Sequence, residues 1–144
     1  MSKKINVLEE PLIGYYTTDD REIFKLIDTV KDGIKYSSFA SLMKQIPFTL
    51  IEWSNYLNIS DRTLQRYSRE KKTFDRMQSE RIIEITMLYK FGTAIFGSKL
   101  QFDEWLSTKN VSLGRKAPKD FLDSSLGIGL LKDALARIEH GILA

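Results

Sequence analysis

The chain lacks residue types that several classes of protein need. It has no cysteine and one histidine, His140. Without thiols it cannot form a disulfide scaffold, a structural zinc site of the cysteine type or a catalytic cysteine. A single histidine near the C-terminus is explained by the helix dipole, which favours a basic residue at the C-terminal end of a helix. We therefore expect no catalytic residue, no metal site and no cofactor, and interpret acids such as Asp103 and Asp120 as surface or helix-end residues.

Long apolar runs are missing as well. No stretch approaches the roughly 20 apolar residues that cross a bilayer. The lysines at the start, Lys3 and Lys4, are not followed by the apolar run of a secretory signal. Of the 144 residues, 42% are hydrophobic and 28% are charged, which is typical of one compact domain or two small ones. We expect a cytoplasmic protein that does not contact a membrane.

The positive charge is concentrated in one short segment. The chain carries a net charge of +3, and Ser60–Phe74 alone holds five Lys or Arg against two Asp or Glu. Elsewhere the signs nearly balance, with seven cations against six acids over residues 98–144. A concentrated basic segment in a nearly neutral protein indicates a contact with a polyanion, although solvated charge runs are common.

Helical periodicity dominates the chain, and almost nothing alternates as a strand would. Proline occurs only at positions 11, 47 and 118, and glycine is sparse. After an irregular arm over residues 1–17, we expect helices at about 18–32, 37–46, 49–57, 61–70, 75–96, 102–106 and 127–140, with a turn starting at Pro118. An apolar stripe marks the first of these (Ile23, Phe24, Ile27, Val30), and Leu130 belongs to the inward face of the last. The predicted fold is all-α, with a helical bundle over residues 18–78 and a second helical domain over 79–144.

The segment Leu50–Arg69 has the spacing of a helix-turn-helix. Ser54 supplies a small side chain where the two helices cross, and Asn58 tolerates the left-handed conformation that the tight turn requires. Ser60 is a favourable N-cap for the second helix. Leu64 and Tyr67, three residues apart, face the first helix. The pattern therefore predicts an N-terminal helix-turn-helix bundle.

With Leu64 and Tyr67 turned inward, polar side chains remain on the outer surface of the second helix. Arginine pairs with guanine edges, glutamine with adenine, and threonine with phosphate or a thymine methyl. We accordingly predict that DNA is contacted by Arg62, Thr63, Gln65, Arg66, Arg69, Lys71 and Lys72. The alternative is an ordinary helical hairpin with a solvated basic face.

Several ordered motifs of the C-terminal half resemble those of a known family. They are Ser79-Glu80-Arg81, Ile95-Phe96-Gly97, Phe102–Asn110 with Trp105, Leu113-Gly114 through Pro118, Phe121–Gly127 and Arg137–Ala144. Together they resemble the Xre/MbcA/ParS toxin-binding domain of the antitoxins that accompany RES-type toxins, and the resemblance extends over roughly residues 20–144. From the residues alone, Trp105 and Leu106 are core anchors, and Gly127-Ile128-Gly129 lacks the preceding strand of a phosphate-binding loop.

The resemblance implies a non-enzymatic, dimeric antitoxin of a type II toxin–antitoxin system. Its partners would be a cognate RES-type toxin that depletes NAD, and operator DNA bound through the helix-turn-helix to repress the operon. It implies that residues 79–144 form the toxin-binding domain, whose C-terminal end approaches the toxin's active-site cleft. The residues so implicated are Arg137, Glu139, His140, Gly141, Ile142, Leu143 and Ala144. We expect the dimer contact to be formed by the long helix that begins near Ser79.

The chain departs from the family pattern at some positions. Arg115 stands where a second glycine is usual, Ala117 where threonine is common, and His140 where a tyrosine often precedes the final glycine. These departures affect the details of the toxin interface. The residues also leave two other functions open: a stand-alone transcription regulator, and an interaction module that has lost DNA binding.

Overall fold

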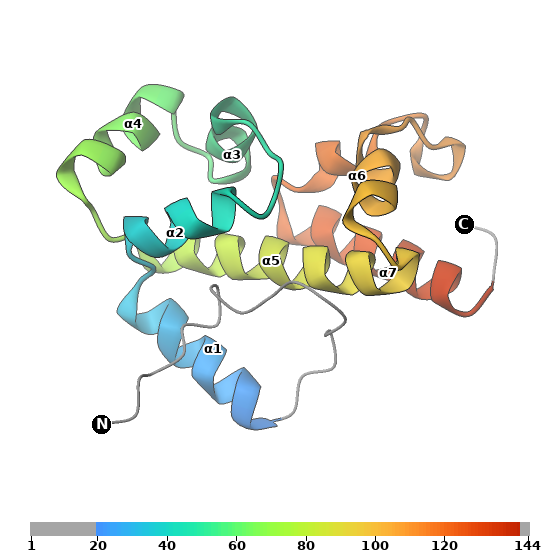
Figure 1. Cartoon of the computed structure of the whole chain (residues 1–144), viewed down its shortest axis with the longest axis horizontal. Coiled ribbons are helices and arrows are strands. Elements are labelled where there is room, and N and C mark those ends of the chain that lie inside the picture. Colours follow the sequence, from blue (N-terminus) through green and yellow to red (C-terminus); the bar gives the residue numbers. More distant parts are fainter. Residues whose placement is uncertain (1–19, 142–144) are drawn as a thin grey trace. The chain divides into compact units, whose positions relative to one another are not determined.

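The computed structural model describes residues 20–141. The expected arm over residues 1–17 and the tail residues Ile142–Ala144 lie outside this range. The elements in order are α1 (Asp20–Asp32), α2 (Tyr36–Met43), α3 (Leu50–Tyr56), α4 (Asp61–Glu70), α5 (Arg76–Phe96), α6 (Lys99–Ser107), the 3₁₀ helices η2 (Val111–Leu113) and η3 (Pro118–Phe121), and α7 (Ser125–Glu139) (Figure 1). Over the described range there are isolated β-bridges but no strand, which confirms the predicted all-α fold.

The chain forms two compact units that divide between Thr86 and Met87. The division lies inside α5, so this one helix contributes its first half to one unit and its second half to the other. The sequence places the domain boundary near the start of this helix, at residue 79. The first half of α5 buries Ile82 and Ile85, and its contacts lie with the helices before it. Each unit is therefore described separately.

Aromatic side chains build the core of the first unit. Phe39 of α2 lies edge-on to Trp53 of α3 at 5.0 Å between ring centroids, and to Phe74 at 5.1 Å. Phe74 in turn lies 5.4 Å from Tyr67 of α4. Phe39, Trp53 and Phe74 are almost completely buried. Such aromatic pairs add about 0.5–1.5 kcal/mol each beyond the burial of area, and they fix α4 against α2 and α3.

A polar link holds the turn after α1 to the start of α5. The Ser79 hydroxyl accepts a hydrogen bond from the Ile34 backbone N–H at 2.9 Å and donates to the Phe74 carbonyl at 3.3 Å. Ser79 is fully buried. At Gly33, which has a φ of +86°, a Cβ would lie 2.6 Å from the Phe74 oxygen. Glycine is therefore required where the chain passes this close to Phe74.

The second unit is held by a core of leucines and aromatic rings. Leu106, Leu122, Leu131 and Leu135 are almost completely buried. Phe102 lies 5.3 Å from Tyr89 and 5.8 Å from Trp105, measured between ring centroids. Gly97 ends α5 with a φ of +77°, as its position in the sequence suggested.

One expectation about burial is wrong, because Leu130 on α7 is 40% exposed and not inward. The apolar stripe that the sequence marks on α1 is also open: Ile23, Phe24 and Ile27 are 43%, 65% and 42% exposed. A helical period identifies an apolar face, but it does not say what covers that face. None of the described helices is both long and apolar enough to cross a membrane.

Candidate DNA and partner interfaces

The helix-turn-helix is built by capping residues in the positions that the sequence indicates. Thr49 and Glu52 form a reciprocal capping box at the start of α3, with both hydrogen bonds at 3.0 Å. The Ser60 hydroxyl oxygen accepts a bond from the Thr63 N–H at 3.0 Å at the start of α4. Asn58, with a φ of +56°, takes the predicted left-handed conformation in the turn. These caps satisfy backbone donors that would otherwise lack partners and fix where each helix begins.

The crossing of α3 and α4 is also as expected. Ser54 is buried, and its hydroxyl donates to the Ile51 carbonyl at 2.7 Å. Leu64 of α4 is fully buried, while Tyr67 is half-buried against Phe74. Because these side chains hold one side of α4 in the core, the opposite side is free for a ligand.

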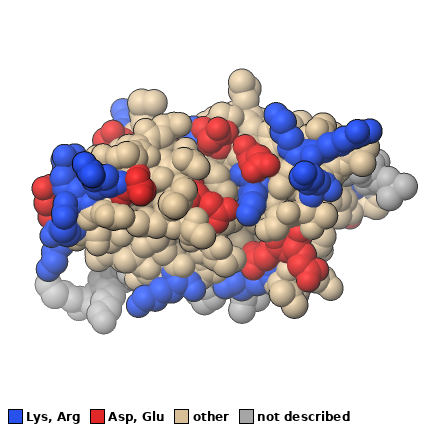
Figure 2. Space-filling view, turned by 90° about the horizontal axis from the view of Figure 1, so that it is seen from above, with Lys and Arg blue, Asp and Glu red and all other residues tan. Residues whose placement is uncertain are grey.

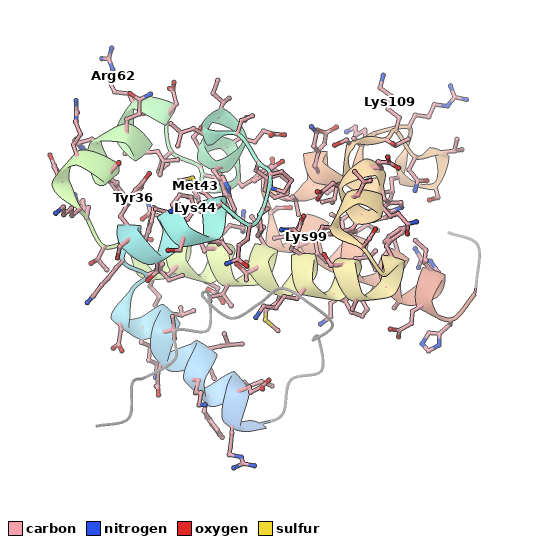
Figure 3. All side chains as sticks on the ribbon, viewed as in Figure 1. Tyr36, Met43, Lys44, Arg62, Lys99 and Lys109 are labelled. Carbon is pink, nitrogen blue, oxygen red and sulfur yellow. The ribbon has the colours of Figure 1, made fainter. Side chains whose placement is uncertain are left out.

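The outer side of α4 carries the predicted DNA contacts. Arg62, Gln65, Arg66 and Arg69 are exposed, and their spacing of three and four residues puts them on one helix face. We call these four residues the recognition face. Figure 2 shows blue side chains gathered over α4, and Figure 3 shows Arg62 pointing away from the ribbon. Arginine and glutamine so displayed are able to pair with guanine and adenine in a major groove.

Three other predicted contacts are placed differently. Thr63 is half-buried, and its hydroxyl lies 2.8 Å from that of Ser60, so it takes part in the helix cap. Lys71 ends α4 in the left-handed conformation, with a φ of +50°. The Lys72 Nζ lies 5.1 Å from the centre of the Tyr67 ring, a cation–π contact. Both lysines are exposed and follow the recognition face in the sequence.

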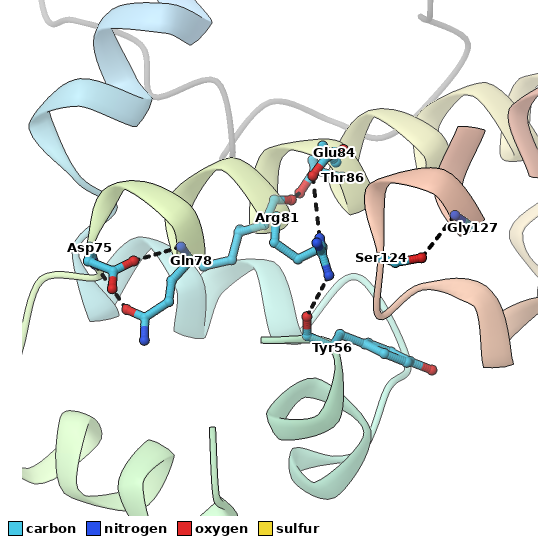
Figure 4. Close-up of polar contacts among 9 residues, drawn as sticks. Tyr56, Asp75, Gln78, Arg81, Glu84, Thr86, Ser124 and Gly127 are labelled. Atoms are coloured by element: carbon cyan, nitrogen blue, oxygen red, sulfur yellow. Dashed lines mark hydrogen bonds and ion pairs between the residues drawn. The ribbon is translucent and has the colours of Figure 1, made fainter. Parts of the chain in front are cut away.

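Residues at the start of α5 cap this helix and bond to the end of α3. Asp75 and Gln78 bond reciprocally at 2.7 and 3.0 Å to cap α5. The Arg81 guanidinium donates to the Tyr56 carbonyl at 3.1 Å and pairs with Glu84 at 3.3 Å (Figure 4). Tyr56 is the last residue of α3, so Arg81 bonds to a carbonyl at the C-terminal end of that helix. The Ser79-Glu80-Arg81 motif therefore has a structural role, which the sequence did not reveal.

The residues implicated in toxin binding lie at the end of α7. Arg137, Glu139, His140 and Gly141 are all exposed. By helical spacing Arg137 and His140 share one side, whereas Glu139 lies on another. Gly141 follows α7 with a φ of +74°. The predicted contacts Ile142, Leu143 and Ala144 lie outside the described residues.

Other motifs of the C-terminal half serve packing. Leu106 is buried, as expected, and Trp105 is partly exposed. The Gly127 N–H donates to the Ser124 hydroxyl at 3.0 Å (Figure 4), and a Cβ at Gly127 would lie 2.1 Å from the Phe121 carbonyl oxygen. Among the described residues, no three or more His, Asp or Glu side chains are grouped so that they could hold a metal ion.

Comparison with known proteins agrees with this architecture. The family model of the antitoxin Xre-like helix-turn-helix domain matches residues 25–86, and that of the antitoxin Xre/MbcA/ParS C-terminal toxin-binding domain matches residues 92–141. The Antitoxin Xre of Yersinia enterocolitica serotype O:8 is 26% identical over 120 residues, which cover 83% of this chain and 81% of that protein. The Antitoxin Xre of Photorhabdus laumondii is 27% identical over 118 residues, covering 73% and 80%.

Proposed function

Because the chain belongs to the antitoxin Xre family in both of its domains, we propose that it neutralises a RES-type, NAD-depleting toxin by blocking the toxin's active-site cleft. Residues 79–144 act as the toxin-binding domain, and Arg137, Glu139, His140 and the tail Gly141–Ala144 approach the cleft. The antitoxin itself catalyses nothing; it excludes the toxin's substrate by covering the surface around the toxin's cleft. An interface of about 800 Å² on each partner is enough for tight binding.

We further propose that the helix-turn-helix domain, residues 18–78, represses the operon that encodes the pair. The observation that carries this proposal is the recognition face, four exposed side chains of which three are arginines, on a helix fixed by a cap and by buried Leu64. The protein would act in the cytoplasm, where the operator is accessible.

Two-fold assembly belongs to the same proposal, since one short recognition helix makes few base contacts and a second half-site supplies the rest. The long helix α5 is the dimer contact expected from the sequence, but its apolar side chains from Ile82 to Tyr89 are largely buried within the two units. The exposed Ile23, Phe24 and Ile27 of α1 offer a better surface. Residues 21–32 carry three cations and three acids, so two copies of α1 would not repel each other.

Co-expression with the adjacent small open reading frame tests the antitoxin function. We expect the neighbour to arrest growth alone, and the full-length chain to rescue growth and to co-purify with it. A chain truncated after Glu139 should lose the rescue if the tail enters the cleft. A harmless neighbour that does not co-purify would contradict the toxin partner and leave a stand-alone transcription regulator.

The proposed DNA binding is tested by measuring the affinity of the chain for the promoter of the toxin–antitoxin operon. The double variant Arg62→Ala/Arg66→Ala should weaken binding by about 1–3 kcal/mol for each lost base contact. The matched control is Lys99→Ala/Lys132→Ala, which removes two exposed cations from the second unit. If both double variants lost the same DNA affinity, only net charge would matter. If the wild type did not bind the promoter, the chain would be an interaction module without DNA binding.

A further inference from the structure

A second concentration of positive charge lies between α6 and α7. Residues 109–119, which we call the basic loop, hold Lys109, Arg115, Lys116 and Lys119 and no Asp or Glu. Lys109, Arg115 and Lys116 are exposed, and none of these three forms an ion pair within residues 20–141. Figure 3 shows Lys109 pointing away from the ribbon. Such unneutralised cations attract an acidic partner.

The backbone of the basic loop is fixed in place. The Asn110 N–H donates to the Lys116 carbonyl at 3.0 Å, and the Arg115 N–H donates to the Asn110 carbonyl at 2.9 Å. The Asn110 side-chain oxygen also accepts bonds from the Ser112 N–H and hydroxyl at 2.9 and 2.7 Å. Leu113 is buried beneath the loop. Because the loop is already ordered, binding through it costs little backbone entropy.

Arg115 occupies a position that favours glycine. Its φ is +64°, in the left-handed region, directly after Gly114 with a φ of +70°. A side chain there costs roughly 1 kcal/mol, and only asparagine or aspartate recovers part of it through local hydrogen bonds. The arginine side chain forms no hydrogen bond or ion pair within residues 20–141 that offsets this cost. A strained residue with an exposed, unpaired charge is expected where the charge serves a partner.

One exposed aliphatic side chain indicates which kind of partner this is. Val111, the third residue of the loop, is 82% exposed. DNA backbone contacts are made by charged and polar groups, so the valine would gain nothing there. A protein surface with an apolar spot bordered by acids matches both the valine and the cations. The loop also lies inside the match to the toxin-binding domain, residues 92–141, and outside the helix-turn-helix match.

We propose that the basic loop docks on an acidic patch of the toxin, with Val111 against an apolar spot and Lys109, Arg115 and Lys116 around it. The inference rests on the proposed function, and it adds a contact distinct from the C-terminal tail. Charges at the border of an interface mainly raise the association rate, and their effect depends on salt. The loop would therefore guide the antitoxin onto its toxin before the tail enters the cleft.

The test uses the full-length chain and the toxin encoded beside it. The variant Lys109→Gln/Arg115→Gly/Lys116→Gln removes three charges and also relieves the strain at position 115. The matched control Lys44→Gln/Lys99→Gln/Lys132→Gln removes three exposed cations elsewhere. Association and dissociation rates with the toxin are measured at about 50 and about 300 mM salt, because screening separates charge effects from packing effects. Binding to operator DNA is measured in parallel.

We expect the loop variant to associate with the toxin about tenfold more slowly at low salt, with a smaller difference at high salt. Its DNA affinity should match that of the control, and its melting temperature should not fall, because glycine fits position 115. Toxin kinetics equal to the control would overturn the inference, and so would a loss confined to DNA binding. If the wild type does not bind the toxin, the proposed function itself fails, which is a different outcome.

Discussion

The ring of Phe102 lies against the backbone of α5 at Gly92. A Cβ at Gly92 would be 2.1 Å from the ring carbon Cε1, and Phe102 is fully buried. The substitution Gly92→Ala should therefore lower the free energy of unfolding by about 1–3 kcal/mol, since the ring has to move within a packed core. Denaturant unfolding measures this effect.

Gly129 on α7 provides the control for Gly92. It also lies within a helix, but nothing stands within 4 Å of the position of its Cβ. The substitution Gly129→Ala should raise the free energy of unfolding by about 0.5–1 kcal/mol through helix propensity. If the two alanine variants changed stability alike, the close contact between Gly92 and Phe102 would be wrong.

Buried Tyr89 and its partly exposed partner Asp103 make the stability of the second unit depend on pH in the alkaline range. The Tyr89 hydroxyl donates to the Asp103 Oδ1 at 2.5 Å. Burial, followed by this bond and by the charge of Asp103, raises the pKa of Tyr89 well above its usual value. The folded state thus favours the neutral phenol, and this stabilisation is fully present below about pH 10 and is lost as the pH rises further.

A spectroscopic titration of tyrosinate tests this prediction. In the folded chain one tyrosine should ionise only with alkaline unfolding, and Tyr89→Phe should remove that late step. A titration curve whose shape is unchanged by Tyr89→Phe would contradict the raised pKa. The variant should also lose roughly 1–2 kcal/mol of stability near neutral pH, because Asp103 loses its partner.

At the scale of the element, the sequence predicted the ends of helices better than it predicted which side chains are buried. Ser60 and Asn58 could be assigned because a cap and a left-handed turn depend on the residue itself. Leu130 was assigned to the inward face of α7 by its helical spacing, but it is 40% exposed. Whether a face is covered depends on distant segments, which local periodicity does not contain.

The same contrast applies to the candidate site. The recognition face followed from spacing, because residues three and four apart lie together on any helix. The basic loop was missed because its cations were averaged with the acids of residues 98–144. The sequence showed Arg115 only as a departure from a glycine. Its left-handed φ of +64° explains both the glycine of the family pattern and the strain in this chain.

The cap of α4 links the stability of one helix to DNA binding. The Ser60 hydroxyl accepts the Thr63 N–H at 3.0 Å, and Arg62 lies between these two residues. The substitution Ser60→Ala should cost about 1 kcal/mol in the free energy of unfolding. It should also weaken operator binding, because the first turn of the recognition helix becomes less ordered. Urea unfolding and a DNA titration measure the two effects.

Ser68→Ala is the control for the cap, since Ser68 lies exposed within the same helix. Alanine has the higher helix propensity, so stability should be unchanged or slightly increased. An equal loss of stability in both serine variants would show that the Ser60 hydroxyl contributes no capping energy.

At the scale of the whole molecule, the proposed dimer depends on α1. Phe24→Glu places a charge at the centre of the exposed apolar stripe, and a like charge on the second copy would face it across a two-fold axis. We expect the variant to sediment as a monomer at concentrations where the wild type is a dimer. Its affinity for an operator with two half-sites should fall to nearly that for a single half-site, because the second recognition helix is no longer linked to the first.

A control at a matched position decides whether α1 forms this contact. Leu100 of α6 is 70% exposed, close to the 65% of Phe24, so Leu100→Glu adds the same charge at similar exposure in the other unit. Leu100→Glu should remain dimeric and bind both half-sites. Toxin binding by Phe24→Glu should persist, since the toxin-binding match begins at residue 92. If Phe24→Glu stays dimeric while its DNA affinity is unchanged, the second copy contacts another surface and the exposed stripe of α1 has a different partner.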